Sequence, residues 1–115
     1  MSVTRHEPGP ILSLAVEHGQ TVYLAGVVAK DLKADVKGQT QEILNEIDRL
    51  LAKCGSNKSK ILQATIWVTD IRNRAPMNEV WTAWVDKKNL PARACVEAAL
   101  ADPNAFVEIM VTAAK

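Results

Sequence analysis

The sequence predicts a single α+β domain over residues 1–115, in which one β-sheet is covered by two helices on one of its faces. Three observations lead to this prediction. The chain has 115 residues and a hydrophobic content of 48%, which fit one domain with one core. Apolar residues switch along the chain between strand-like and helix-like spacing. Two predicted helices are too few to cover both faces of a sheet of about five strands.

The first half of the chain predicts a hairpin and a long helix. The stretch ILSLAVEHGQTVYLAG contains two apolar runs around Gly19, which readily supplies the positive φ of a tight turn. This pattern predicts a β-hairpin over residues 11–25. Residues 26–34 show neither period. The helix predicted next ends near Gly55 and has apolar residues at helical spacing, namely Val36, Ile43, Leu44, Ile47, Leu50 and Leu51.

The second half predicts a strand, a helix and two more strands. The stretch ILQATIWVTD is rich in β-branched residues, which favour strands. A helix is predicted over residues 76–87, because Met77, Trp81 and Trp84 share one helical stripe. Pro91 follows it, and ARACVEAA and FVEIMVTAA are predicted strands separated by the turn-rich LADPNA. The predicted order is β-β-α-β-α-β-β.

The predicted strands carry apolar side chains on both of their faces. In the strand near residue 65, for example, Ile66 alternates with Trp67. The face that the helices leave uncovered therefore needs a partner, and an oligomer whose sheets pack together is the simplest arrangement. Short strands buried within a monomer would give the same pattern.

Composition excludes several classes of protein. Lys and Arg total 14 against 13 Asp and Glu, without a block of like charge, so a nucleic-acid partner is not expected. Cys54 and Cys95 lie outside any CxxC pattern and are expected to be reduced thiols. The N-terminal MSVTRHEPGP is too polar for a signal peptide, and no apolar run approaches the roughly 20 residues of a membrane span. We expect a soluble cytoplasmic protein.

The histidines do not support a familiar catalytic constellation. His6 in the N-terminal tail and His18 in the predicted turn are both expected to be exposed to solvent. A Ser-His-Asp or Cys-His arrangement is therefore not predicted. Phosphate-binding glycine motifs, HExxH and paired metal-ligand spacings are also missing. The sequence predicts neither a metal site nor a nucleotide cofactor.

Arg93 is the most conspicuous candidate for a binding site. It lies in a predicted strand, on the same alternation as Cys95 and Glu97, and Glu108 lies in the last strand. A guanidinium in a half-buried cleft suits bidentate capture of a carboxylate. The structural alternative is an Arg–Glu pair across the sheet or a subunit contact. Without other information, Cys95 is expected to be a small core residue. Glu97 is expected to be solvated or paired with a cation.

Several blocks, in this order and spacing, resemble the RidA/YjgF family of reactive-intermediate deaminases. They are YLAGVVAKD, GSNKSKILQATIWVTD, MNEVWTAWV, LPARACVEAAL and VEIMVTAA. The second block is most similar to the short YoaB-like branch, and the resemblance covers about residues 10–115. It implies a chorismate-mutase-like α+β domain with a mixed sheet, which assembles into a homotrimer with clefts between subunits.

The resemblance also implies an activity, the hydrolysis of 2-enamine or 2-imino acids such as 2-aminoacrylate or 2-iminobutanoate to 2-oxo acids and ammonia, without a cofactor. In such a site Arg93 would bind the substrate carboxylate between subunits. Glu108 would position the attacking water or take part in proton transfer. Asn78 and Cys95 would line the site, together with Ala25 and Gly26.

Two positions depart from the family pattern. Many members have a tyrosine after Gly-Pro where this chain has Ile11 and Leu12, and Ser-Gly where it has Ala25 and Gly26. Loss of both hydroxyls leaves a more apolar pocket. One alternative is therefore a non-catalytic trimer that binds small carboxylates or 2-oxo acids and regulates a partner. A third, ribonuclease activity, is disfavoured by the near-neutral charge and the lack of a His/Lys acid–base pair.

Overall fold

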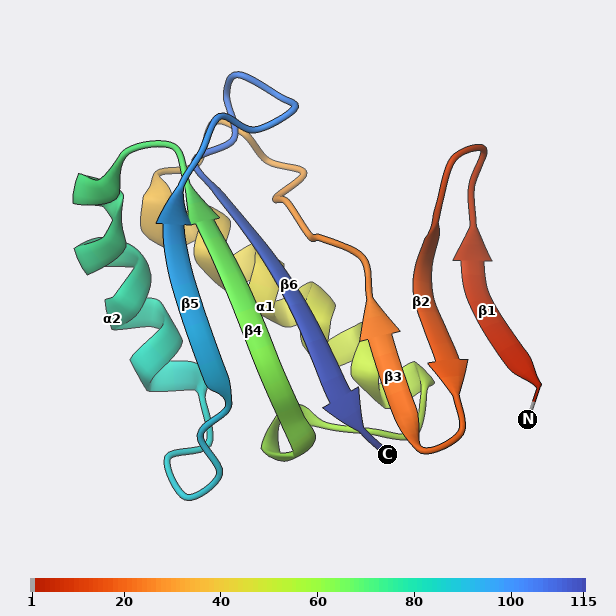
Figure 1. The fold of residues 1–115 in the computed structure, drawn as a ribbon. Helices are drawn as coiled ribbons and strands as arrows, with labels where there is room; N and C mark the ends of the chain where they lie inside the picture. Colours follow the sequence, from red (N-terminus) through yellow and green to blue (C-terminus); the bar gives the residue numbers. More distant parts are fainter. Residues whose placement is uncertain (1) are drawn as a thin grey trace.

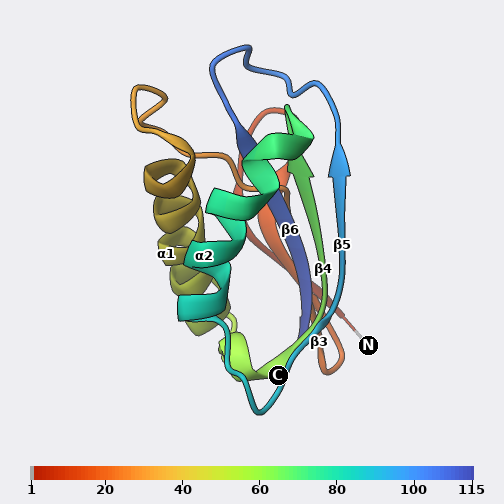
Figure 2. The same ribbon diagram turned by 90° about the vertical axis from the view of Figure 1, so that its left-hand side faces the viewer.

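The structure, a computed structural model, describes residues 2–115. They form one six-stranded sheet and two α-helices (Figure 1), and both helices lie on the same side of the sheet (Figure 2). The predicted fold class is therefore confirmed. The strands are β1 (Val3–Pro8), β2 (Ser13–His18), β3 (Thr21–Leu24), β4 (Ile61–Val68), β5 (Ala92–Glu97) and β6 (Val107–Ala114). The helices are α1 (Val36–Lys53) and α2 (Arg74–Trp84).

The structure adds the N-terminal strand β1 to the predicted order, which becomes β-β-β-α-β-α-β-β. β1 lies at the edge of the sheet and pairs with β2 alone. Its sequence VTRHEP lacks an apolar alternation because an edge strand keeps much of its surface in water. The predicted hairpin is confirmed as β2 and β3, with Gly19 in the turn at φ 60°.

Strand β6 joins the two halves of the sheet. The strand order is β1-β2-β3-β6-β4-β5, so the last strand lies between β3 and β4 and is antiparallel to both. β4 and β5 are parallel, and α2 forms the crossover between them. On β6, Ile109 and Val111 are buried among the core residues.

The core lies between α1 and the sheet. α1 begins after Asp35, whose side chain accepts a hydrogen bond from the Gly38 N–H at 2.8 Å. It ends before Gly55, which has a φ of 75°. The apolar residues predicted for its inner face include Ile43, Leu44, Ile47, Leu50 and Leu51, all of which are buried. No helix among residues 2–115 combines the length and apolar composition needed to cross a membrane.

Helix α2 packs beside α1 through the predicted stripe of Met77, Trp81 and Trp84, which are buried. The indole N–H of Trp84 donates to Asp48 Oδ2 on α1 at 2.9 Å. The helix covers residues 74–84 rather than the predicted 76–87. It ends at Trp84 because the next residue, Val85, has an extended backbone with ψ 146°. The Asp86 carboxylate then accepts from the Lys88 N–H at 3.0 Å in the turn that follows.

The sheet face opposite the helices, called the open face below, is partly apolar. Strand register places the side chains of Trp67, Glu108 and Val96 in one row across it, and those of Thr65 and Met110 in the next. Val96 and Met110 are 43% and 41% exposed. The single chain therefore leaves uncovered the second apolar face that the sequence predicts.

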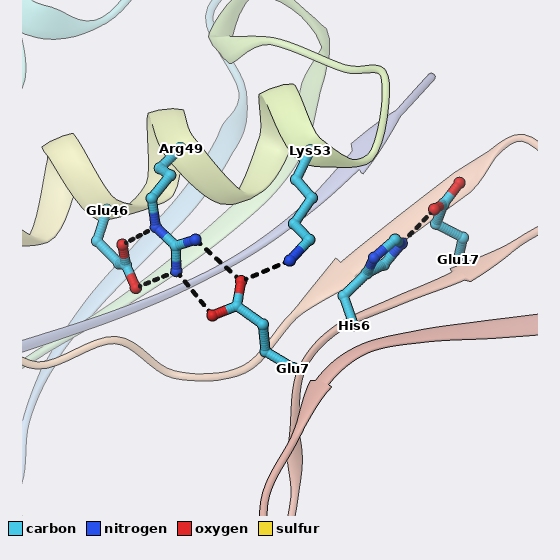
Figure 3. A network of polar contacts seen from close by, with 6 residues as sticks. All are labelled: His6, Glu7, Glu17, Glu46, Arg49 and Lys53. Carbon is cyan, nitrogen blue, oxygen red and sulfur yellow. Dashed lines mark hydrogen bonds and ion pairs between the residues drawn. The ribbon is translucent and has the colours of Figure 1, made fainter.

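A polar network attaches the end of β1 to α1 (Figure 3). The Glu7 carboxylate accepts from Arg49 Nη1 at 2.9 Å and from Lys53 Nζ at 3.1 Å, and Arg49 Nε donates to Glu46 Oε1 at 2.7 Å. Hydrogen bonds from Arg49 and Lys53 lower the pKa of Glu7 to about 2. The network holds the outer hairpin against the helix.

Gln39 provides a buried polar link between α1 and the segment that leads into β6. Its amide nitrogen donates to the carbonyls of Ala34 and Asn104, both at 3.2 Å, and its amide oxygen accepts from the Phe106 N–H at 2.8 Å. The side chain is fully buried. The buried amide therefore has all three of these hydrogen bonds with backbone groups.

We predict that Gln39→Leu destabilises the fold by about 2 kcal/mol or more, because three backbone partners lose their hydrogen bonds. Gln41→Leu is the matched control on the exposed side of α1, and we expect it to change stability by less than about 0.5 kcal/mol. Denaturant unfolding measures both values, and hydrogen exchange should show faster exchange of the Phe106 amide in Gln39→Leu alone. Equal stabilities for the two variants would contradict this role of Gln39.

Candidate functional site

Arg93 points to the helix side of the edge strand β5, where two neighbours on α2 orient it. Its Nη1 donates to Asn78 Oδ1 at 2.7 Å. Its guanidinium carbon lies 5.4 Å from the centroid of the Trp81 ring, within the range of a cation–π interaction. Arg93 and Asn78, both proposed as site residues from the sequence, are therefore in direct contact. Trp81 was predicted only as a core residue, because its helical stripe gave no sign of a second role.

The Arg–Glu pair that the sequence allowed is not formed within residues 2–115. The described residues place no carboxylate within ion-pair distance of Arg93. Glu97, on the same face of β5, instead accepts from the Ile71 N–H at 2.8 Å and so has a structural role. The remaining donors of the Arg93 fork are available to a ligand.

A pocket of about 530 Å³ lies beside Arg93. Its lining mixes donors with apolar surface and consists of Asn78, Trp81, Thr82, Val85, Lys87, Leu90 and Arg93. An oriented guanidinium, an amide and an ammonium group at the wall of a partly apolar pocket suit a small organic carboxylate. Lys87 and Thr82 were not predicted, because only the fold brings the end of α2 beside β5.

Cys95 lies two residues beyond Arg93 on the same side of β5. It is partly buried and packs against the hydrophobic core. This packing agrees with the core role that the residue pattern indicated. Cys95 is nevertheless partly exposed, on the same strand face as Arg93.

Glu108 occupies the open face of β6, and its carboxylate packs against Gly26. A Cβ atom placed on Gly26 would lie only 2.2 Å from Glu108 Oε2. On either side of this glycine, the Ala25 N–H donates to Leu14 at 3.0 Å and the Val27 N–H to Ile109 at 2.8 Å. The segment is therefore fixed close to β6. Gly26 leaves the space that the Glu108 carboxylate occupies.

The structure brings the predicted residues together in two separate groups. Arg93, Asn78 and Cys95 lie on the helix side of the sheet, whereas Glu108 and Gly26 lie together at the open face. The sheet separates Arg93 from Glu108 within one chain. Ile11, which differs from the family pattern, belongs to neither group. It lies at the tip of the β1–β2 hairpin, where its side chain is 89% exposed.

A second cavity, of about 730 Å³, lies between α1, the β1–β2 hairpin and the segment after β3. Ala25 and Gly26 form part of its wall, and Glu7, Glu46 and Arg49 of the polar network also line it. The sequence gave no indication of this cavity, because its walls come from segments far apart in the chain.

Comparison with known proteins identifies the family. A family model described as "Endoribonuclease L-PSP" matches residues 4–115. The chain is 44% identical to a RutC family protein of Haemophilus influenzae over 98% of both chains. It is 42% identical to the RutC family protein YoaB of Escherichia coli K12 over 99% of both.

Solved structures agree with these sequence matches. A YjgF family member from Neisseria meningitidis superposes with a TM-score of 0.97 at 43% identity, with 100% of this chain and 96% of that chain covered. A member of the conserved Rid protein family from Yersinia pestis gives a TM-score of 0.85 at 29% identity, with 94% and 90% covered. The resemblance predicted from sequence is thus confirmed: the chain belongs to the YjgF/RutC family, with relatives that include YoaB.

Proposed function

We propose that this protein is a cofactor-independent deaminase that hydrolyses 2-imino and 2-enamino acids to 2-oxo acids and ammonia. The observation that carries the proposal is Arg93, which is held by Asn78 and Trp81 but has no carboxylate partner among residues 2–115. Such a guanidinium is prepared to bind the carboxylate that all these substrates carry. The resemblance to the RidA/YjgF family implies the same activity, and the family matches are consistent with it.

The complete site requires two copies of the chain. Arg93 and Glu108 lie on opposite faces of one sheet, so a substrate that meets both must lie between copies. The partly apolar open face supports assembly, because packing against another copy would remove Val96 and Met110 from water. We propose a homotrimer with one cleft at each interface.

In the proposed reaction, the substrate carboxylate pairs with Arg93 of one copy. Glu108 of the adjacent copy holds a water molecule against the imine carbon and accepts a proton from it during attack. Glu108 then returns this proton to the amine nitrogen, and the tetrahedral adduct expels ammonia, so that imino acid and water give 2-oxo acid and ammonia. A 2-enamino acid reacts after it has tautomerised to the imine. Free imines hydrolyse without a catalyst, and positioning therefore supplies much of the rate enhancement.

Ala25, where many family members have a serine, precedes the Gly26 that packs against Glu108, and the loss of this hydroxyl favours substrates with an apolar side chain, such as 2-iminobutanoate. This loss also motivates the second candidate function, a trimer that binds 2-oxo acids without turnover and regulates a partner. The ribonuclease activity in the family model's description has less support, because His6 pairs with Glu17 and the net charge is only +1. The free thiols Cys54 and Cys95 fit a reducing cytoplasm.

We predict that Arg93→Ala slows imine hydrolysis by about 100-fold or more, because the substrate loses its anchor. The assay follows decay of 2-iminobutanoate, formed in situ by a dehydratase and trapped with semicarbazide. Arg72→Ala is the matched control, since this exposed arginine pairs with Asp70 instead. Wild-type protein without effect on the decay would contradict the deaminase proposal, and binding of 2-oxobutanoate by calorimetry would then support the regulatory trimer.

We predict that two inactive variants restore activity when they share a trimer. Arg93→Ala and Glu108→Gln are unfolded together and refolded as a mixture, so that some interfaces receive an intact Arg93 from one chain and an intact Glu108 from the other. Random assembly gives about one quarter of the wild-type number of intact sites. The same variants refolded separately are the control. A mixture with no more activity than the separate variants would contradict a site shared between copies.

We predict that Gly26→Ala lowers the rate about 10-fold or more, because the added methyl group displaces the Glu108 carboxylate. Gly9→Ala is the matched control, since its added Cβ would meet only an ordinary contact at 3.6 Å. Circular dichroism checks that both variants fold. If Gly26 positions Glu108, combining Gly26→Ala with Glu108→Gln adds little further loss, whereas fully multiplicative losses would contradict that role.

A further inference from the structure

Three side chains that commonly bind metals meet at the end of α1, away from Arg93 and Glu108. They are His6 of β1, Glu17 of β2 and Cys54, the residue that follows α1. One ligand atom from each lies within 4.8 Å of the other two. In the described part of the chain, residues 2–115, these three side chains lie close enough to share one metal ion.

Strand pairing explains why His6 and Glu17 meet. In the β1–β2 register, His6 pairs with Ala15 and Glu17 pairs with Thr4, so the two side chains are diagonal neighbours on one face. His6 Nε2 contacts Glu17 Oε2 directly (Figure 3). His6 was expected to be exposed in a tail; that expectation is wrong, because its side chain is only 17% exposed in β1.

Cys54 completes the group from the helix. It is buried, with only 3% of its surface exposed. Burial raises the pKa of its thiol, and the nearby Glu17 carboxylate acts in the same direction. The C-terminal end of a helix also carries a partial negative charge, which favours a cation there. The other Glu17 oxygen, Oε1, pairs with Lys115, so Oε2 is the oxygen directed toward the group.

We propose that His6, Glu17 and Cys54 bind Zn²⁺ and thereby link the β1–β2 hairpin to the end of α1. Imidazole nitrogen, carboxylate oxygen and thiolate sulfur are the three ligand types that zinc uses in proteins. A water molecule occupies the fourth tetrahedral position, and the thiol proton passes to solvent when sulfur binds the metal. This inference is independent of the proposed deaminase activity.

The geometry requires only a small adjustment. Zinc–ligand bonds of about 2.0–2.3 Å place tetrahedral ligand atoms roughly 3.3–3.7 Å apart. The separations of up to 4.8 Å among the three atoms therefore close through side-chain rotation about staggered bonds. In the metal-bound form, Glu17 Oε2 and His6 Nε2 exchange their mutual contact for bonds to the metal.

Sequence spacing predicted no metal site, because His6 and Glu17 lie 11 positions apart and Cys54 lies in a different part of the chain. Metal-binding motifs that can be recognised in a sequence have ligands at short, regular spacings. Here the ligands come from two strands and a helix end, so only the tertiary fold brings them together. The hairpin, already attached through Glu7, would gain a second attachment to α1.

The test uses Co²⁺ as a spectroscopic probe on the full chain after treatment with a chelator. We expect a near-ultraviolet thiolate-to-cobalt charge-transfer band, together with intense visible bands of tetrahedral Co²⁺, and loss of both on adding Zn²⁺. The chain provides matched controls for both ligand types. Cys54→Ser should abolish the charge-transfer band, whereas Cys95→Ser should retain it. His6→Gln should weaken Co²⁺ binding about 10-fold or more, whereas His18→Gln should not.

A wild-type protein without the charge-transfer band would overturn the proposal, and so would a band that survives in Cys54→Ser or is lost in Cys95→Ser. If Cys54→Ser does not fold, the two histidine variants decide, since both alter outer strands. Zn²⁺ should also raise the melting temperature of wild-type protein and of His18→Gln more than that of His6→Gln. Equal increases in all three proteins would show that zinc binds elsewhere.

Discussion

The pairing of β6 with both β3 and β4 is the interaction on which the rest of the structure depends. The last eight residues before the C-terminal Lys115 close the sheet between a hairpin from the start of the chain and a β-α-β unit from its second half. The same strand contributes Ile109 to the core and Glu108 to the open face, and it pairs with Val27 beyond the end of β3. Core, sheet and candidate site therefore depend on the same long-range pairing, whose formation costs loop-closure entropy.

Local patterns in the sequence predicted most of the elements. The hairpin around Gly19, α1 and β4 have strong periodicity, and the structure confirms them. β1 was missed because strand patterns are recognised by a buried apolar face, which VTRHEP does not have. The C-terminal end of α2 was misplaced because Val85 adopts an extended backbone before the Asp86 turn, and helical periodicity does not reveal this change.

The candidate site was predictable as a set of residues but not as an arrangement. The family resemblance selected Arg93, Asn78 and Glu108, and Arg93 and Asn78 do meet. Alternation along a strand gives the relative faces of Arg93 and Cys95, but the face of Glu108 relative to Arg93 depends on the register across β4. Register is set by tertiary packing. Because these contacts also depend on tertiary packing, the sequence did not predict that Trp81 would contact Arg93 or that His6 would lie near Cys54.

The composition of β1 has a consequence for the behaviour of the protein at high concentration. An edge strand offers unpaired backbone groups to any other extended chain and can seed sheet-to-sheet aggregation. β1 presents the exposed Arg5, the ion-paired Glu7 and, at its end, Pro8, which has no N–H to donate. Charge, attachment to α1 and a proline each oppose the addition of a foreign strand. The polar composition that kept β1 from being recognised as a strand thus also opposes the pairing of this edge with strands of other molecules.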